Sequence, residues 1–115
     1  MKLIQATAIL IALAALAGCH SHVVNVNLTN TSKDTVKTII VDYPTATFGK
    51  DKLSPGETFS YAIKPLETGL IRIQFTDAQG SIHTYNGSQL HKNDEGSIAV
   101  NMNQSGMVVQ PSLKR

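Results

Sequence analysis

The sequence predicts an all-β protein whose folded part is an antiparallel β-sandwich of about seven strands. After position 22, apolar residues recur with period two, which is the spacing of a half-buried strand. Clusters of turn-forming residues separate these runs at regular intervals, and no ten-residue run there has the pattern of an amphipathic helix. Two sheets can bury their apolar faces against each other in about 100 residues, so a sandwich is favoured.

The expected strands follow one another along the chain. The first begins after Val23, where Val24, Val26 and Leu28 alternate with asparagines. The later runs cover residues 35–43, 45–48, 58–64, 70–76, 81–85 and 97–102, and residues 107–109 are a candidate eighth strand. The run at 45–48 has the weakest alternation of the set.

Turns are expected wherever Asn, Asp, Ser, Gly and Pro gather. Such clusters occupy residues 30–34, 54–57, 77–80, 86–88 and 93–96. In the second cluster, Pro55 presets φ for the first central position of a turn and Gly56 accepts a positive φ at the next position. This pair therefore predicts a tight turn just before the strand at 58–64.

The first eighteen residues have the features of a secretory signal peptide. Lys2 precedes an apolar stretch from Leu3 to Ala15 that only Gln5 and Thr7 interrupt. The stretch is shorter than the roughly 20 apolar residues that cross a bilayer as a helix. We therefore expect this segment to direct export and then to be removed.

The end of this segment, Leu16-Ala17-Gly18-Cys19, resembles the lipobox of bacterial lipoproteins. The resemblance implies that Cys19 receives a diacylglyceryl group and becomes the new amino terminus. In that class an aspartate after the cysteine usually signals retention in the inner membrane, and this chain has His20, which favours the outer membrane if the cell is Gram-negative. Cys19 is also the one cysteine of the chain, so no disulfide within the chain can form and lipidation explains the residue.

The folded part is also similar to bacterial immunoglobulin-like and fibronectin-type surface modules. The similarity lies in Val26-Asn27-Leu28-Thr29-Asn30-Thr31-Ser32, in Leu53-Ser54-Pro55-Gly56-Glu57 before a strand, and in the strand from Gly69 to Asp77. It implies an immunoglobulin-like sandwich and says nothing of function, because such sandwiches serve many roles. The expected organisation is a signal peptide at 1–18, a lipidated tether at 19–22, a β-sandwich at 23–110 and a polar C-terminal tail at 111–115.

Composition argues against several classes of function. The net charge of +2 is far from the basic excess typical of nucleic-acid-binding proteins, so no nucleic-acid partner is expected. The four histidines, among them His20 and His22, lack the further ligands of a structural metal site, and no metal or other cofactor is expected. No Gly-x-Ser-x-Gly or similar nucleophile motif occurs, so no catalytic residue is assigned and the protein is not expected to be an enzyme.

One strand suggests a partner-binding face. Ile39, Ile40 and Val41 are continuously apolar, and Tyr43 follows on the Ile39 side. Either this strand is covered on both faces, or Ile39, Val41 and Tyr43 form an exposed patch that binds a partner. The same two alternatives hold for Tyr61 and Tyr85, since tyrosine occurs both at the rim of a core and on binding surfaces.

These features favour a non-catalytic interaction or assembly module, attached by its N-terminal lipid to the bacterial cell envelope and binding an envelope protein. The first alternative is a module that binds carbohydrate or matrix. A further alternative is an envelope enzyme or an enzyme inhibitor, for which residues 43–52 would be the projecting loop.

Overall fold

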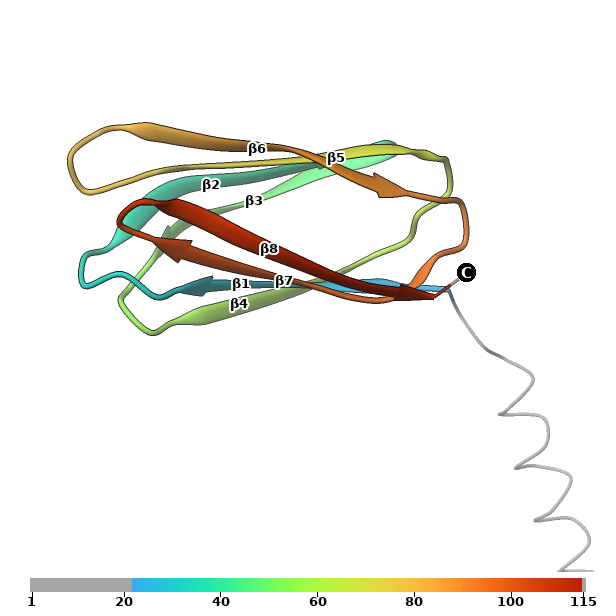
Figure 1. The fold of residues 1–115 in the computed structure, drawn as a ribbon, viewed down its shortest axis with the longest axis horizontal. Coiled ribbons are helices and arrows are strands. Elements are labelled where there is room, and N and C mark those ends of the chain that lie inside the picture. Colours follow the sequence, from blue (N-terminus) through green and yellow to red (C-terminus); the bar gives the residue numbers. More distant parts are fainter. Residues whose placement is uncertain (1–21, 115) are drawn as a thin grey trace, which may run out of the picture.

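The alternating runs form strands throughout the part of the chain that the computed structural model describes, residues 22–114 (Figure 1). This confirms the all-β prediction, with eight strands in that part. They are β1 (Val24–Asn30), β2 (Val36–Tyr43), β3 (Ala46–Leu53), β4 (Thr58–Ile63), β5 (Gly69–Thr76), β6 (Ile82–Leu90), β7 (Glu95–Asn103) and β8 (Gly106–Lys114). The predicted signal peptide (1–18), Cys19 and most of the predicted tether lie outside the described residues.

The strands form two four-stranded sheets, ordered β4-β1-β7-β8 and β3-β2-β5-β6, which face each other as a sandwich (Figure 1). The second sheet has the order C′-C-F-G of a variable-type immunoglobulin domain, and β4-β1 matches strands E-B. The place of strand A beside B is taken by β7, which pairs with β1 in parallel. The expectation of an antiparallel sandwich is therefore wrong at this one pair among the described strands, and the other five pairings are antiparallel.

The core lies between the two sheets and is made of the inward residues of the alternating strands. Phe75 is its largest fully buried side chain. The buried apolar residues are Val24, Val26, Leu28, Val36, Ile39, Val41, Phe48, Leu53, Ile63, Ile71, Ile73, Phe75, Leu90, Ile98, Val100 and Met102. Burial of such side chains contributes about 25 cal/mol per Å² and is what holds the sheets together.

A bulge in β2 changes the phase of its alternation. The register with β5 shifts between Lys37 and Ile40, and Thr38 between them has a φ of 52°. This left-handed conformation is unusual for a β-branched residue. The extra residue lets Val36 and Ile39, three positions apart, both point into the core.

Two boundaries differ from the sequence-based prediction. Residues 86–88 do not form a turn, because β6 continues through them with a bulge opposite Ile71 and Arg72. The predicted polar tail at 111–115 is also wrong, since β8 pairs with β7 as far as Lys114. Pro111 is compatible with this strand, because the hydrogen bonds of β7 to β1 direct the amide position of residue 111 toward solvent.

The turn at Ser54–Glu57 forms as predicted. Gly56 has a φ of 80°, and the Glu57 amide donates to the Ser54 carbonyl at 3.0 Å. Gly56 also donates to the carbonyl of Asn30, 2.7 Å away, so this turn is tied to the end of β1.

Asn30 holds three segments together at that end of the sandwich. Its side chain is fully buried. Its Nδ2 donates to the carbonyl oxygens of Asp34 (2.8 Å) and Leu53 (2.9 Å), while its Oδ1 accepts from the amide and hydroxyl of Ser32. A single buried amide thus links β1 to the following loop and to β3.

The loops gather at two ends of the molecule. One end holds the start of β1, the β2–β3 turn, the β4–β5 and β6–β7 loops and the C-terminus, and we call it the N-terminal end (Figure 1). The far end holds the other four connections. In residues 22–114, no helix is long and apolar enough to span a membrane.

Candidate functional site

Four aromatic side chains line one open side of the sandwich, where the edge strand of one sheet faces the edge strand of the other. Phe48 comes from β3, Phe59 and Tyr61 come from β4, and Tyr43 ends β2. The chain has three tyrosines and three phenylalanines, so most of its aromatic content lies here. We call these four residues the aromatic seam.

The rings of the aromatic seam contact one another. Phe48 stacks on Tyr61, with centroids 4.3 Å apart and an interplanar angle of 15°. Tyr43 and Phe59 lie 6.4 and 6.5 Å from Phe48 in tilted arrangements. Phe48 is only 8% exposed, whereas Tyr61 is 42% exposed. Phe48 therefore supports Tyr61 from the core side, and Tyr61 presents an aromatic surface to water.

Tyr43 lies at the inner rim of the seam. Partial burial raises the pKa of its hydroxyl above the ordinary value, and the neighbouring Tyr61 adds to this effect. Tyr43 therefore stays a neutral phenol that can donate a hydrogen bond at any physiological pH.

Lys50 is an inward-facing charge on an edge strand. It lies opposite the buried Ile39, so the two side chains share the inner face of their sheet. Its ammonium lies 5.0 Å from the centroid of Phe59, within the range of a cation–π contact. An inward charge of this kind prevents another strand from pairing with β3.

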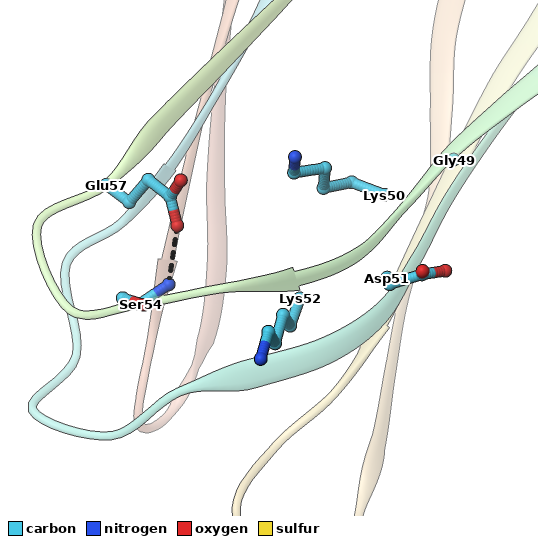
Figure 2. A pocket seen from close by; sticks show the side chains of 6 residues that line it. All are labelled: Gly49, Lys50, Asp51, Lys52, Ser54 and Glu57. Atoms are coloured by element: carbon cyan, nitrogen blue, oxygen red, sulfur yellow. Dashed lines mark hydrogen bonds between the residues drawn. The ribbon is translucent and has the colours of Figure 1, made fainter.

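Beside the seam is a shallow, open cleft of about 500 Å³, lined by Gly49, Lys50, Asp51, Lys52, Ser54 and Glu57. In the view of Figure 2, Lys50 and Glu57 extend toward each other, while Lys52 leaves on the other side of the β3 ribbon. Oε1 of Glu57 accepts from the Ser54 amide at 2.9 Å, which holds this carboxylate at the turn. The cleft carries charges of both signs and adjoins the aromatic rings.

The backbone of β4 leaves one row of hydrogen-bonding groups directed away from the protein. Asn30 donates directly to Glu57 across the β1–β4 register, whereas the odd-numbered Thr31 donates to β7. The even-numbered residues of β1 therefore bond to β4, and the odd-numbered residues bond to β7. Phe59 and Tyr61 lie opposite even-numbered residues, so their backbone groups are directed to β1. The backbone N–H and C=O groups of Thr58, Ser60 and Ala62 point outward from the sheet edge.

Of the four edge strands in the described sheets, β4 is the one without a feature that blocks further pairing. β3 carries Lys50, Asp51 and Lys52, β6 has its bulge, and β8 contains Pro111. The β4 sequence TFSYAI has no charge and no proline, and its six residues pair with β1 in unbroken register. Edge strands of this kind accept an additional strand.

The predicted partner-binding face of Ile39, Val41 and Tyr43 is wrong for its first two residues. Ile39 and Val41 are 1% and 0% exposed and pack in the core, because the Thr38 bulge turns them inward. Only Tyr43 reaches the candidate site, as a member of the seam. β2 lies between β3 and β5, and the core covers its inner face, while Ile40 on the outer face is half-buried, so the strand is not covered on both faces.

Sequence reasoning named Tyr61 but missed Phe48, Phe59 and Lys50 as its neighbours. The sequence feature that could have identified the site is the alternating run 58–63, which is flanked by turns and has no charged residue. A strand without charge or proline is typical of a sheet edge that can accept another strand. Residues 43–52 are not a projecting loop, because β2 and β3 are joined by a tight turn at Pro44 and Thr45.

Cys19 and the histidines were the other residues that the sequence singled out. Cys19 lies outside the described residues. His22 contacts the carboxylate of Glu95 at the start of β7. Within residues 22–114, no group of three or more His, Cys, Asp or Glu side chains is arranged to hold a metal ion.

Comparison with known proteins supports the fold and does not indicate a function. No protein-family model matches the chain, and no curated protein matches it in sequence. Its structure is similar to the NMR structure of a protein from Eubacterium rectale, with a TM-score of 0.59 and 14% sequence identity. The match covers 77% of this chain and 87% of the other.

Proposed function

We propose that this chain is a membrane-anchored, non-catalytic interaction module of the bacterial cell envelope. In this proposal it binds an extended segment of an envelope protein by adding that segment to the edge of β4. The observation that carries the proposal is that the edge of β4 has no charge, proline or bulge and directs the backbone groups of Thr58, Ser60 and Ala62 outward.

The aromatic seam specifies which strand would fit. A strand added beside β4 places alternate side chains next to Phe59 and Tyr61, on the inner side of the sheet. Apolar side chains there would cover the exposed ring of Tyr61 and replace water around it. The expected ligand is therefore an extended segment with apolar residues at alternate positions.

The anchor in this proposal is lipid on Cys19. Two or three acyl chains, at about 0.8 kcal/mol per buried methylene, hold a protein on a membrane far more firmly than one chain. With His20 after the cysteine, we propose the outer membrane as its location in a Gram-negative cell. The lipidated residue would then be separated from His22 by two residues.

A photo-crosslinking amino acid at Ser60 tests the proposal in intact cells. Its side chain is exposed, so the fold should tolerate it. We expect a covalent adduct with an envelope protein, and we expect Ala62→Pro to abolish it because proline removes an outward N–H. The matched control Ala62→Thr keeps the N–H and should keep the adduct.

The melting temperature of Ala62→Pro should stay close to that of the unmodified protein, because the amide of residue 62 does not bond to β1. An adduct that persists in the folded Ala62→Pro variant would exclude strand addition at β4.

Carbohydrate binding is the second candidate, and the exposed ring of Tyr61 backed by Phe48 favours it. Substitutions at two adjacent residues distinguish carbohydrate binding from strand addition. Tyr61→Ala removes the ring and would abolish retention on a polysaccharide, whereas Ala62→Pro leaves the ring and would not. Strand addition instead predicts that Ala62→Pro abolishes binding of the protein partner and that Tyr61→Ala weakens it.

A further inference from the structure

The N-terminal end of the sandwich carries exposed leucines together with lysines. Leu66 in the β4–β5 loop is 58% exposed, and Leu70, the second residue of β5, is 62% exposed. Three exposed lysines lie at the same end: Lys64 directly after β4, Lys92 in the β6–β7 loop and Lys114 at the end of β8. We call these five residues the end surface.

The loop that presents Leu66 is held in place by hydrogen bonds. The Asn93 amide donates to the carbonyl of Pro65 at 2.9 Å. The Lys92 amide donates to Oγ1 of Thr68 at 3.1 Å. Because residues on both sides of Leu66 are tied to the β6–β7 loop, the exposed leucine and Lys92 are held together at one end of the protein.

Two carboxylates at this end lie beside histidines. Asp94 is buried beside His91, and Glu95 contacts His22. Glu67 is the remaining carboxylate of the β4–β5 loop. The three lysines therefore lie at the same end as these carboxylates and as the exposed leucines.

The far end also carries charges of both signs and exposed apolar side chains. Its turns carry Lys33 with three carboxylates, Asp34, Glu57 and Asp77. Ile82, at the start of β6, and Val108, near the start of β8, are 65% and 48% exposed at the far end. What sets the N-terminal end apart is its position beside His22, where the N-terminal segment joins the sandwich.

We propose that the end surface rests on the lipid bilayer, with Leu66 inserted among the acyl chains and the lysines on anionic phospholipid headgroups. This inference rests on the proposed anchor at Cys19. If Cys19 is the mature terminus, the two residues between it and His22 place this end within about 10 Å of the lipid. Lysines near an anionic membrane surface are attracted to it, and an exposed apolar side chain gains by entering the boundary between headgroups and acyl chains.

The proposal also orients the candidate site. The strands would stand on the membrane, with β4 running away from it from Ile63 toward Thr58. The β4 edge then faces sideways, where a neighbouring envelope protein can reach it.

The test uses the full lipidated protein with a single new thiol. Leu66→Cys is labelled with an environment-sensitive fluorophore, since Cys19 would be blocked by its lipid. The protein is placed in vesicles of phosphatidylcholine with phosphatidylglycerol, which also contain a spin-labelled quenching lipid. We expect loss of fluorescence at position 66 and no loss for the matched variant Gln104→Cys in the far-end β7–β8 turn.

Charge dependence is measured in the same system. The double variant Lys64→Gln and Lys92→Gln, and vesicles of phosphatidylcholine alone, should each reduce the quenching at position 66. Equal quenching at positions 66 and 104, or quenching that does not depend on the charge of the lipid, would overturn the proposal.

Two further measurements show whether the proposed lipid anchor at Cys19 exists. Mass spectrometry of the mature protein shows whether Cys19 carries lipid, and flotation shows whether the protein stays with the vesicles. A lipidated protein that floats but is not quenched at position 66 disproves the orientation and leaves the proposed function intact. A protein without lipid disproves the anchor first.

Discussion

Phe48 and Tyr61 stack with their centroids 4.3 Å apart, and this contact joins the edge strand of one sheet to the edge strand of the other. The two residues belong to strands that share no backbone ladder. Side chains alone therefore close this side of the sandwich, and they leave Tyr61 partly in water.

Tyr61→Ala should lower the free energy of unfolding by about 1 kcal/mol, since an aromatic pair of this kind contributes roughly 0.5–1.5 kcal/mol beyond area burial. Phe75→Ala, in the fully buried core, should cost about 3–5 kcal/mol. Urea denaturation of both variants measures the difference. Equal losses would mean that Tyr61 is a core residue and unavailable to a ligand.

Asn30→Ala should destabilise the protein by about 2–3 kcal/mol, because the buried carbonyls of Asp34 and Leu53 lose their donor. Asn30→Asp should be at least as harmful, since a carboxylate would face those same carbonyl oxygens. Thermal unfolding followed by circular dichroism is the measurement. A melting temperature unchanged by Asn30→Ala would contradict the role assigned to this amide.

Gly96→Ala should be more harmful than Gly80→Ala, although both glycines have positive φ. A Cβ on Gly80 meets open space, so only the left-handed conformation is penalised, by about 1–2 kcal/mol. A Cβ on Gly96 would lie 2.1 Å from the carbonyl oxygen of Ser112 and would push β8 away from β7. Denaturation midpoints rank the two, and the opposite order would show that β8 is not packed as described.

The β5–β6 hairpin should weaken in acid because of Asp77. Its Oδ2 lies 2.7 Å from Nε2 of His83, and its Oδ1 accepts from the Gln79 and Ser81 amides. The hydrogen bond from His83 and those from the amides lower the pKa of Asp77 below its ordinary value. The stabilisation is therefore complete above the pKa of the unfolded chain, near 4, and is lost as pH falls through the lower folded value.

This dependence is measured as the difference in melting temperature between the unmodified protein and Asp77→Asn. The difference should be present at neutral pH and should shrink below about pH 4. Asp51→Asn, an exposed carboxylate of β3, is the control. A difference that grew on acidification would contradict the assignment.

Cys19→Ser should abolish incorporation of an acyl probe in metabolic labelling, because the thiol is the group expected to be acylated. The protein should then be released from membranes or remain as uncleaved precursor. Labelling that persists without Cys19 would exclude lipidation at this residue.

The sequence by itself determined the strand class, most of the inward residues and the Pro55-Gly56 turn, because these depend on local alternation and on φ preferences of single residues. It also carried the signal for the open edge, in the uncharged run at 58–63. Only the tertiary structure decided the bulge at Thr38, which placed Ile39 and Val41 in the core. A register shift depends on the partner strand, which local periodicity does not contain.

The parallel pairing of β1 with β7, the extension of β8 to Lys114 and the stacking of Phe48 on Tyr61 were likewise decided by residues distant in the chain. A polar segment such as 111–114 becomes a strand because a neighbouring strand supplies its hydrogen bonds, although its own pattern favours a tail. The aromatic seam exists because the two sheets meet there, and their packing is a property of the whole domain.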